Sequence, residues 1–444
     1  MTANKTDALK ENILKKTGSE DIILSEGLEF YAIDGVVPDL ACYPHNTAEL
    51  QKIIQASDQE KFPVIPFGGF TRVNTFEYSE RSFAAVDLKR MNRVIFYDPA
   101  EFVIIPEAGI TISELNKVLA ENGQFCGFNP PETEKATLGG VLASNSYGYF
   151  REFYGLPRDN VLGMKFVKAD GTLIKSGGKV AKNVAGYNLQ RLMTGSWGTL
   201  GIITEAAIRV YSLPDIQKTF TAEFLSPNDA ANTIILLQDS CNSPVFTAVL
   251  SNIKTSVDQN SDKIKVIFGA DGIKENVDKM VDRFHKVCKE NNVIDTKLFS
   301  EDGSVSLRNN ISEFNSSQYS GIIIKILSTR MGILNLFEVI NNSQNDFILK
   351  PEVLAYPGSG VMYIRISGSN DYPESGELKN TVLQIKSLLD NDNCFCVLEK
   401  IPKELKKEMH VWPQFNGYSL MQKIKTKFDP NNILNPERYI RTHS

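Results

Sequence analysis

Glycine clusters embedded in apolar sequence between Ala136 and Glu205 constrain this chain more than any other feature. The stretch begins ATLGGVLASNSYG and ends GGKVAKNVAGYNLQRLMTGSWGTLGIITE. Ordered glycine costs backbone entropy, so such clusters are expected where another group must approach the main chain closely. The residues between the glycines are apolar or carry hydroxyls, unlike the repetitive composition of a linker. The stretch therefore predicts a folded surface that binds a large cofactor carrying phosphates.

Length and composition narrow the class of protein. A chain of 444 residues is expected to form two or three domains, because one hydrophobic core rarely extends so far. Hydrophobic residues make up 42% and charged residues 23%, which is ordinary for a soluble globular protein. A net charge of -5 without a long basic run disfavours nucleic acid as a partner.

The cysteines and the N-terminus indicate a cytoplasmic protein. None of the six cysteines forms a CxxC, so an iron–sulfur cluster within this chain is not expected, and buried free thiols in a reducing compartment are favoured. The N-terminus lacks the apolar segment of a signal peptide, and no run approaches eighteen apolar residues. Contact with a membrane is therefore expected only peripherally, through a partner.

Hydrophobic patterning divides the chain into four parts. Residues 1–35 are expected to form a polar helical lead-in, and residues 36–215 show the α/β pattern that contains the glycine clusters. In residues 216–410, strands alternate with amphipathic helices, which is typical of an α+β domain that covers another. Residues 411–444 form a C-terminal segment that returns to the first domain.

Local signals predict several elements of the first domain. Asn46 with Glu49, and Thr111 with Glu114, are typical of helix N-termini, the second as a capping box. Asp170-Gly171 predicts a hairpin turn. In the second domain we expect strands at Val245–Leu250, Ile264–Phe268, Ile322–Leu327, Val361–Ile366 and Phe395–Leu398, and helices at Lys274–Glu290, Gly332–Asn341, Glu377–Leu389 and in the run KELKKEMHV.

Three glycine-containing motifs carry the functional signal. Pro66–Thr71 follows a strand and has the composition of an anion-binding turn; Ala136–Asn145 carries a Gly-Gly pair among hydroxyls; and Lys182–Tyr187 is followed by Gly195–Gly201. Each alone also fits a plain packed turn. No GxGxxG and no GxxxxGK[ST] occurs, so nicotinamide or ATP binding lacks support.

The three motifs in this order resemble the FAD-binding domain of the vanillyl-alcohol oxidase / p-cresol methylhydroxylase family, and within it the FAD-binding subunits of bacterial glycolate oxidase. The resemblance is strong over about 34–214, weak in the middle, and returns at Lys427–Pro430 and Asn435-Pro436. It implies an α+β fold: a two-subdomain p-cresol methylhydroxylase-type FAD-binding domain plus an α+β cap domain with an antiparallel sheet. Other matching positions are Arg158-Asp159, Val161–Gly163, Gly177-Gly178, Arg191–Met193 and Trp412.

The resemblance also implies a set of FAD-binding residues. Main-chain N–H groups of the first motif would hold the pyrophosphate. The implied residues are Phe67, Gly68, Gly69, Phe70 and Thr71 at the pyrophosphate; Thr137, Gly139, Gly140, Ser144 and Asn145 beside the flavin and diphosphate; Lys182, Asn183 and Gly186 near the isoalloxazine; and Gly201, Ile202 and Ile203 along the ADP part.

Two positions depart from the family pattern. Phe70 stands where the family usually has a third glycine, and if φ is positive there, the side chain costs on the order of 1 kcal/mol of strain. Relatives with covalently bound flavin carry a histidine near this position, whereas residues 67–74 contain neither histidine nor cysteine, so FAD is expected to be non-covalent. The ending Asn-Pro-Glu-Arg replaces the common Asn-Pro-Gly-Arg, which leaves the role of Arg438 open.

No catalytic base stands out. The four histidines, His45, His285, His410 and His443, are scattered without HxH or HxxxH spacing. Larger flavin subunits of this family use paired histidines with a carboxylate as a metal site, which this sequence cannot supply, so no metal is expected. His285 reads as a surface residue. The weak candidates for substrate contacts are Tyr187 and Arg438, with His410 as a base.

Two functional hypotheses follow from the resemblance. In the first, the chain is an FAD-dependent dehydrogenase of a small 2-hydroxy acid such as glycolate or D-lactate, or one subunit of it, with a larger flavoprotein subunit and an iron–sulfur subunit as partners. In the second, it is an assembly or electron-relay flavoprotein subunit without its own substrate chemistry. A cell-wall precursor reductase of the same flavin fold is disfavoured by the Asn-Val-Ala-Gly-Tyr element and the Phe-Asp-Pro ending.

Overall fold

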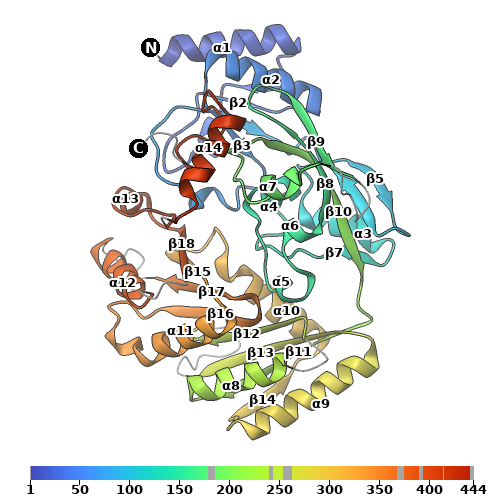
Figure 1. Ribbon diagram of the computed structural model, residues 1–444, viewed down its shortest axis with the longest axis vertical. Helices are drawn as coiled ribbons and strands as arrows, with labels where there is room; N and C mark the ends of the chain where they lie inside the picture. The colour runs from blue at the N-terminus through green and yellow to red at the C-terminus, as the bar shows by residue number, and fades with distance from the viewer. Residues whose placement is uncertain are drawn as a thin grey trace. The chain divides into compact units, whose positions relative to one another are not determined.

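The computed structural model describes residues 2–178, 186–239, 244–253, 263–367, 375–389, 394–413 and 415–440. They form two compact units, each with its own sheets and helices (Figure 1). Unit 1 comprises Met1–Tyr147, Leu156–Leu213 and Gln414–Ser444, and unit 2 comprises Gly148–Gly155 and Pro214–Pro413. The short segment Gly148–Gly155 therefore belongs with the later part of the chain, a feature that the sequence did not indicate. The domain roles inferred from sequence stay predictions.

The first sheet of unit 1 has four strands in the order β1-β2-β4-β3. β2, β4 and β3 are parallel, and β1 pairs with β2 in the antiparallel sense. Asn46 caps α2 by accepting a hydrogen bond from the Glu49 N–H, as predicted. The elements are α1 (Thr2–Thr17), β1 (Ile23–Leu24), η1 (Leu28–Tyr31), β2 (Leu40–Cys42), α2 (Thr47–Glu60), β3 (Val64–Phe67), η2 (Val73–Thr75) and β4 (Ala84–Asp87).

The prediction that residues 1–35 form a polar helical lead-in is correct only for the first half of this range. α1 ends at Thr17, where Gly18 adopts a positive φ of 74°. Beyond it, Ile22 and Tyr31 are fully buried, and on α1 itself Leu9 and Ile13 pack into the core of the first sheet. The N-terminal segment is thus part of this core. The sequence pattern missed this because its few apolar residues are separated by many lysines and acidic residues.

The second sheet of unit 1 has six strands, with β7 pairing to β10 beside the path β5-β6-β10-β8-β9, and it is antiparallel throughout. The capping box of Thr111 and Glu114 is present, and the β8–β9 hairpin turns at Asp170-Gly171, so both predictions are confirmed. The elements are β5 (Val94–Asp98), β6 (Val103–Pro106), α3 (Ile112–Ala120), β7 (Gln124–Cys126), α4 (Leu138–Ser144), α6 (Pro157–Asn160), β8 (Val161–Val167), β9 (Leu173–Gly177), α7 (Leu189–Met193), β10 (Ile202–Ser212) and the C-terminal α14 (Tyr418–Phe428).

Unit 2 is built on an eight-stranded antiparallel sheet in the order β14-β11-β13-β12-β16-β17-β15-β18. Apolar side chains of α8, α9, α11 and α12 join those of the sheet in one hydrophobic core. Figure 1 shows the course of these helices and strands. The elements are α5 (Arg151–Tyr154), β11 (Ile216–Phe224), α8 (Pro227–Gln238), β12 (Phe246–Ser251), β13 (Ile264–Gly272), α9 (Lys274–Glu290), β14 (Asp295–Leu298), α10 (Glu301–Ser312), η3 (Glu313–Asn315), β15 (Ile322–Leu327), α11 (Arg330–Asn342), η4 (Gln344–Asp346), β16 (Glu352–Tyr356), η5 (Pro357–Ser359), β17 (Val361–Ile366), α12 (Ser375–Ser387), β18 (Phe395–Lys400) and α13 (Lys403–Lys406).

Apart from the run KELKKEMHV, the predicted strands and helices of this unit are present, and the α+β fold with an antiparallel sheet is confirmed. β11, β14, β16, α8 and α10 were missed; in β11, β14 and α10, charged or polar residues interrupt the apolar pattern. The run KELKKEMHV is wrong as a helix: only Lys403–Lys406 is helical.

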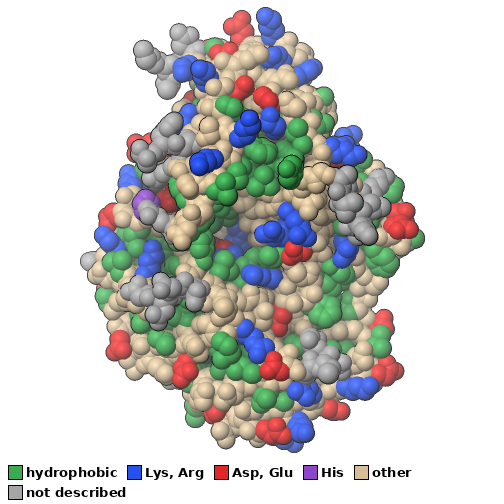
Figure 2. All heavy atoms as spheres, in the orientation of Figure 1, with side chains coloured by type: hydrophobic (Ala, Val, Ile, Leu, Met, Phe, Trp, Pro, Cys, Tyr) green, Lys and Arg blue, Asp and Glu red, His purple; other side chains and the backbone are tan. Residues whose placement is uncertain are grey.

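The surface carries basic and acidic side chains interspersed over the face seen in Figure 2, as on ordinary solvent-exposed surface. Within the described residues, no helix combines the length and apolar character needed to cross a membrane. The five cysteines that the structure describes are free thiols, and three of them are buried.

Candidate functional site: a glycine-lined pocket

Segments from all three glycine motifs line one pocket in unit 1. The pocket lies where β3 ends, where α4 begins and where β10 begins. It is largely apolar, and among its described lining residues Arg72 alone carries a charge. The lining residues are Pro66, Phe67, Gly68, Gly69, Phe70, Thr71, Arg72, Val73, Phe76, Leu88, Ala108, Thr137, Gly139, Gly140, Ala143, Ser144, Trp197, Gly198, Gly201, Ile202 and Ile203.

The turn after β3 needs glycine because another chain segment lies against it. A Cβ at Gly69 would lie 1.8 Å from the Lys135 carbonyl oxygen, and one at Gly68 would lie 2.1 Å from Thr137 Oγ1. Both glycines have φ outside the left-handed region. Glycine is therefore required here because the two chain segments approach closely, and not because of its conformational freedom. The first motif therefore lies in direct contact with the start of the second motif, and main-chain atoms form this wall of the pocket.

Helix α4 is fixed at both ends by its own motif. Thr137 caps it by accepting a hydrogen bond from the Gly140 N–H at 3.3 Å. The Gly139 N–H donates to the Ala108 carbonyl at 2.7 Å, and a Cβ on Gly139 would lie 2.8 Å from that of Ala108. At the C-terminal end the Ser144 hydroxyl donates to the Gly140 carbonyl. The Gly-Gly pair therefore lets this helix start directly at the pocket.

The third motif reaches the pocket through the loop 195–201. The Gly195 and Trp197 N–H groups donate to the carbonyls of Leu142 and Ala143, at 2.9 and 2.8 Å. Trp197 itself has a positive φ of 55°. These bonds tie the loop to α4, and the chain then enters β10 along Ile202.

Phe70, at the place of the usual third glycine, has a φ of 62°, so the position does require the left-handed region. Its ring stacks on Phe67 with centroids 4.8 Å apart and lies edge-on to Phe30 at 4.7 Å. The Lys89 ammonium lies 4.9 Å from its centroid. These contacts explain how a bulky residue is held in a strained backbone conformation.

A buried pair of polar side chains, Tyr31 and Asp87, supports the turn that follows β3. The Tyr31 hydroxyl donates to Asp87 Oδ2 at 2.8 Å, and the Lys89 N–H donates to the other carboxylate oxygen. Burial raises the pKa of both Asp87 and Tyr31 above their ordinary values. Asp87 ends β4 and directly precedes Leu88, which lines the pocket.

Several predicted residues are not gathered into this pocket. Asn145 is the C-cap of α4, where its φ is 49° and its side-chain oxygen accepts from the Arg158 N–H. Gly186 is exposed, and Tyr187 is 92% exposed. Lys182 and Asn183 lie outside the described residues.

None of the weak catalytic candidates is among the described residues that line the pocket. Arg438 is 1% exposed; its guanidinium lies over the Phe83 ring at 5.6 Å, and burial lowers its pKa to about 10. That position suits a packing role in unit 1. His410 is exposed and belongs to unit 2.

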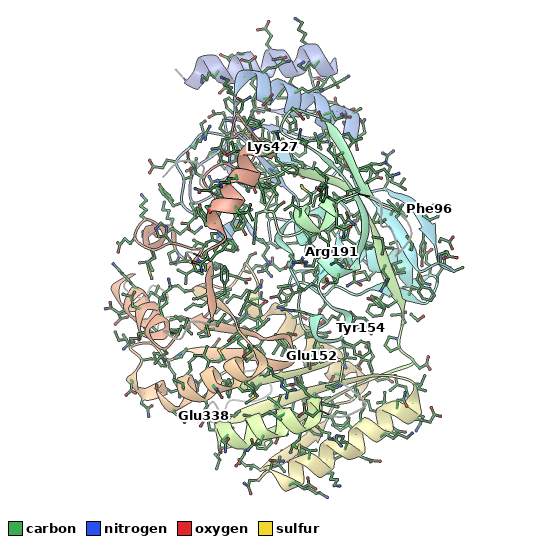
Figure 3. The ribbon with its side chains drawn as sticks, in the orientation of Figure 1. Phe96, Glu152, Tyr154, Arg191, Glu338 and Lys427 are labelled. Atoms are coloured by element: carbon green, nitrogen blue, oxygen red, sulfur yellow. The ribbon has the colours of Figure 1, made fainter. Side chains whose placement is uncertain are left out.

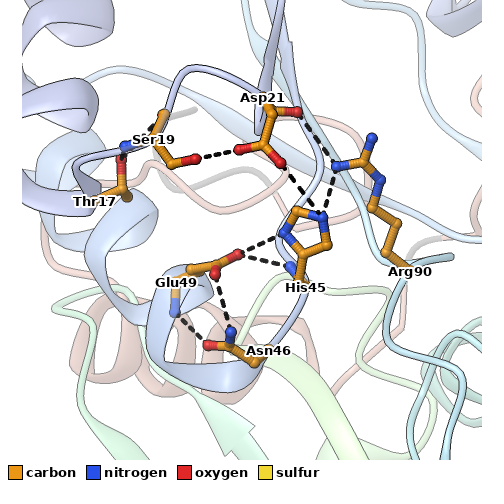
Figure 4. A network of polar contacts seen from close by, with 7 residues as sticks. All are labelled: Thr17, Ser19, Asp21, His45, Asn46, Glu49 and Arg90. Atoms are coloured by element: carbon orange, nitrogen blue, oxygen red, sulfur yellow. Dashed lines mark hydrogen bonds and ion pairs between the residues drawn. The ribbon is translucent and has the colours of Figure 1, made fainter.

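The histidines do not form a metal centre in the part of the chain that the structure describes, where no group of three or more potential ligands is found. His45 lies in a polar network with Asp21, Glu49 and Arg90 (Figure 4). Arg90 Nη1 donates to His45 Nε2 at 2.9 Å, so Nδ1 carries the proton and donates to Glu49 Oε2. Both ring nitrogens are therefore occupied: Nδ1 by Glu49 of α2, and Nε2 by Arg90, which also donates to the Asp21 carbonyl.

Sequence reasoning missed part of the lining. Trp197 and Gly198 lie inside the third motif but were not assigned a role, and Arg72 directly follows the first motif. Leu88 and Ala108 gave no signal, because they are ordinary apolar residues that tertiary packing alone brings to the pocket.

Solved structures with the same fold define the class. The chain matches p-cresol methylhydroxylase with substrate bound at 18% identity and a TM-score of 0.74, covering 98% of this chain and 96% of the other. It matches alkyldihydroxyacetonephosphate synthase at 19% identity and a TM-score of 0.73, covering 96% and 84%. The chain therefore has the p-cresol methylhydroxylase-type fold.

Sequence comparisons add the cofactor and the kind of chemistry. Residues 38–177 match the FAD binding domain family. The chain is 25% identical to glycolate oxidase subunit GlcD of Bacillus subtilis, over 97% of this chain and 96% of that protein. It is also 25% identical to the mitochondrial D-lactate dehydrogenase [cytochrome] of Arabidopsis thaliana, over 92% and 74%. The chain is an FAD-binding oxidoreductase related to glycolate oxidase subunits and D-lactate dehydrogenases.

Proposed function

We propose that the chain is the FAD-binding subunit of a 2-hydroxy-acid dehydrogenase complex that oxidises glycolate or D-lactate. The observation that carries this proposal is the near full-length similarity to glycolate oxidase subunit GlcD, combined with a pocket that three glycine motifs build. An iron–sulfur subunit and a larger flavoprotein subunit would be its partners. Its location would be cytoplasmic, with any membrane contact made through those partners.

The pocket fits the proposed cofactor. The Gly68-Gly69 turn leaves no room for side chains, which suits a wall of main-chain N–H groups facing a diphosphate. Arg72, beside that turn, would supply a positive charge for the phosphates. FAD, when bound, supplies two-electron redox chemistry, while the protein supplies position and electrostatics. The sixteen FAD-binding residues named from the resemblance belong to this proposal, including those outside the described pocket.

The remaining lining would orient the cofactor and exclude water. Phe67, Leu88 and Ile203 contribute apolar walls, which suit the uncharged parts of a dinucleotide. The described lining residues include neither histidine nor cysteine, the side chains that would form a covalent flavin bond, so we propose that FAD is held non-covalently.

A second candidate function is an electron-relay or assembly subunit whose substrate chemistry is carried by a partner. The observation that favours it concerns the catalytic candidates of unit 1: neither Tyr187 nor Arg438 is among the described residues that line the pocket.

One experiment separates the two functions. The chain is purified alone with FAD, and glycolate or D-lactate is added without oxygen while the flavin absorbance is followed. Bleaching by either acid supports the dehydrogenase. Bleaching that requires added partner subunits supports the relay role. A flavin that neither acid bleaches, with or without partners, would overturn the proposed substrate class.

A further inference from the structure

The C-terminal segment of unit 1 contacts two of the three elements that line the pocket. Leu434 forms a parallel bridge to Val64 of β3, the strand that leads into the Pro66–Thr71 turn. Two main-chain hydrogen bonds make this bridge: the Val64 N–H donates to Ile433 at 2.7 Å, and the Asn435 N–H donates to Val64 at 2.8 Å. The segment thus covers the edge of the first sheet at the pocket.

The same segment holds the loop of the third motif through two side chains. Lys425 Nζ donates to the Thr199 carbonyl at 2.9 Å and to the Leu434 carbonyl at 2.7 Å. Asn435 Nδ2 donates to the Trp197 carbonyl at 2.7 Å. The Thr199 and Trp197 carbonyls belong to the loop that presents Trp197, Gly198 and Gly201 to the pocket.

These contacts are buried and pre-organised. The Lys425 side chain is fully buried and forms an ion pair with Asp429, one turn along α14. Asp429 in turn accepts hydrogen bonds from the N–H groups of Ile433 and Leu434, at 2.9 and 2.7 Å, which fixes the turn after the helix. A buried ammonium is costly unless its donors are all used, and here each goes to a group that shapes the pocket or its support.

We propose that residues 425–435 form a clamp that positions the cofactor-binding loop, with Lys425 and Asn435 as positioning residues. The clamp holds the loop 197–201 against β3, the strand that leads into the glycine turn. The distance between the loop and the turn, which form two walls of the pocket, therefore depends on the clamp. Neither side chain lines the pocket, so both act through the main chain of the loop. This inference rests on the proposed placement of FAD in this pocket.

The test measures FAD binding and folding separately. Asn435 has a φ of 45°, which glycine adopts without strain, so N435G removes the side chain alone. We expect N435G to raise the Kd for FAD about tenfold, the effect of one lost buried hydrogen bond, and K425M to raise it at least as much. The matched control is K427M, an exposed lysine on the same helix (Figure 3), which should keep the wild-type Kd.

The measurements distinguish failure of the clamp inference from failure of the proposed function. If the wild type binds no FAD, the proposed function fails. If the wild type binds FAD and N435G binds it equally well, the clamp inference fails, even where K425M does not fold. A lower Tm of the apoprotein with an unchanged Kd for FAD would mean a purely structural role and would also overturn the inference.

Discussion

The pocket of unit 1 and the core of unit 2 hold their polar groups in different ways. The pocket is shaped by main chain: glycines at positions 68, 69 and 139 let one segment lie directly on another. Unit 2 instead buries charged side chains from distant parts of the sequence, such as Arg308 with Asp271. A cofactor site built from main chain requires glycines at particular positions, and these form a motif that can be recognised in the sequence. A core built with buried ion pairs produces no such motif.

The largest expected effect comes from breaking the buried pair of unit 2. Arg308 Nη2 lies 2.6 Å from Asp271 Oδ1, with both side chains at most 5% exposed, and Arg308 Nε also donates to Thr219. We expect R308M to lower the free energy of unfolding by about 3–5 kcal/mol, because it leaves a carboxylate buried without its partner. Calorimetry of the full chain measures the loss.

The double variant R308M/D271L is the control for that prediction. It removes both charges, so it should recover part of the stability that R308M loses. Equal losses in the single and double variants would contradict the view that the unpaired charge is the cause.

Glu152 gives unit 2 a predicted pH dependence. Its carboxylate accepts from the Thr247 N–H at 2.9 Å and from Gln238 Nε2 at 3.0 Å, and burial raises its pKa from 4.5 to about 7. A carboxyl group whose pKa is raised by folding stabilises the fold below pH 4.5, and this contribution is lost as the pH rises to about 7. The loss is about 3 kcal/mol at most.

E152Q should therefore flatten the pH profile of stability. Between pH 5 and pH 8 the Tm of the wild type should fall more steeply than that of E152Q, and E338Q on α11 should follow the wild type (Figure 3). If E152Q and the wild type show parallel profiles, the buried carboxyl is not the source of the dependence.

Part of the fold and of the pocket could be predicted from the sequence, and part could not. The three motifs indicated the cofactor, and local signals such as the Thr111 capping box predicted helix starts that the structure confirms. The partners of Glu152, Thr247 and Gln238, lie about 90 residues along the chain, which no local pattern records. The reason for Gly69 is also tertiary: a Cβ there would meet the Lys135 carbonyl, a contact that the local sequence does not record.

Adding one methyl group to the glycine turn tests the main-chain pocket. A Cβ at Gly69 would lie 1.8 Å from a backbone oxygen, so the turn must move. We expect G69A to introduce about 1–3 kcal/mol of strain, and to raise the Kd for FAD by tenfold or more, measured by flavin fluorescence. G376A is the matched control, because its Cβ meets nothing within 4 Å. Wild-type affinity in G69A would refute the close-approach account.

The smallest expected effect concerns Phe70. F70G relieves a left-handed conformation that costs about 1–2 kcal/mol, but removes ring contacts worth about 0.5–1.5 kcal/mol. The two terms nearly cancel, so the free energy of unfolding should change by less than about 1 kcal/mol in chemical denaturation. A much larger loss would mean that Phe70 supports the pocket beyond these contacts.

The central claim is that the glycine-lined pocket of unit 1 holds FAD non-covalently. The most direct measurement is the flavin content of the purified wild-type chain, followed by acid precipitation and identification of the flavin in the supernatant. The account predicts stoichiometric FAD that is released entirely into the supernatant, and a G69A protein that carries little of it. A folded wild-type chain that carries no flavin after incubation with FAD, or flavin that stays with the precipitate, would contradict it.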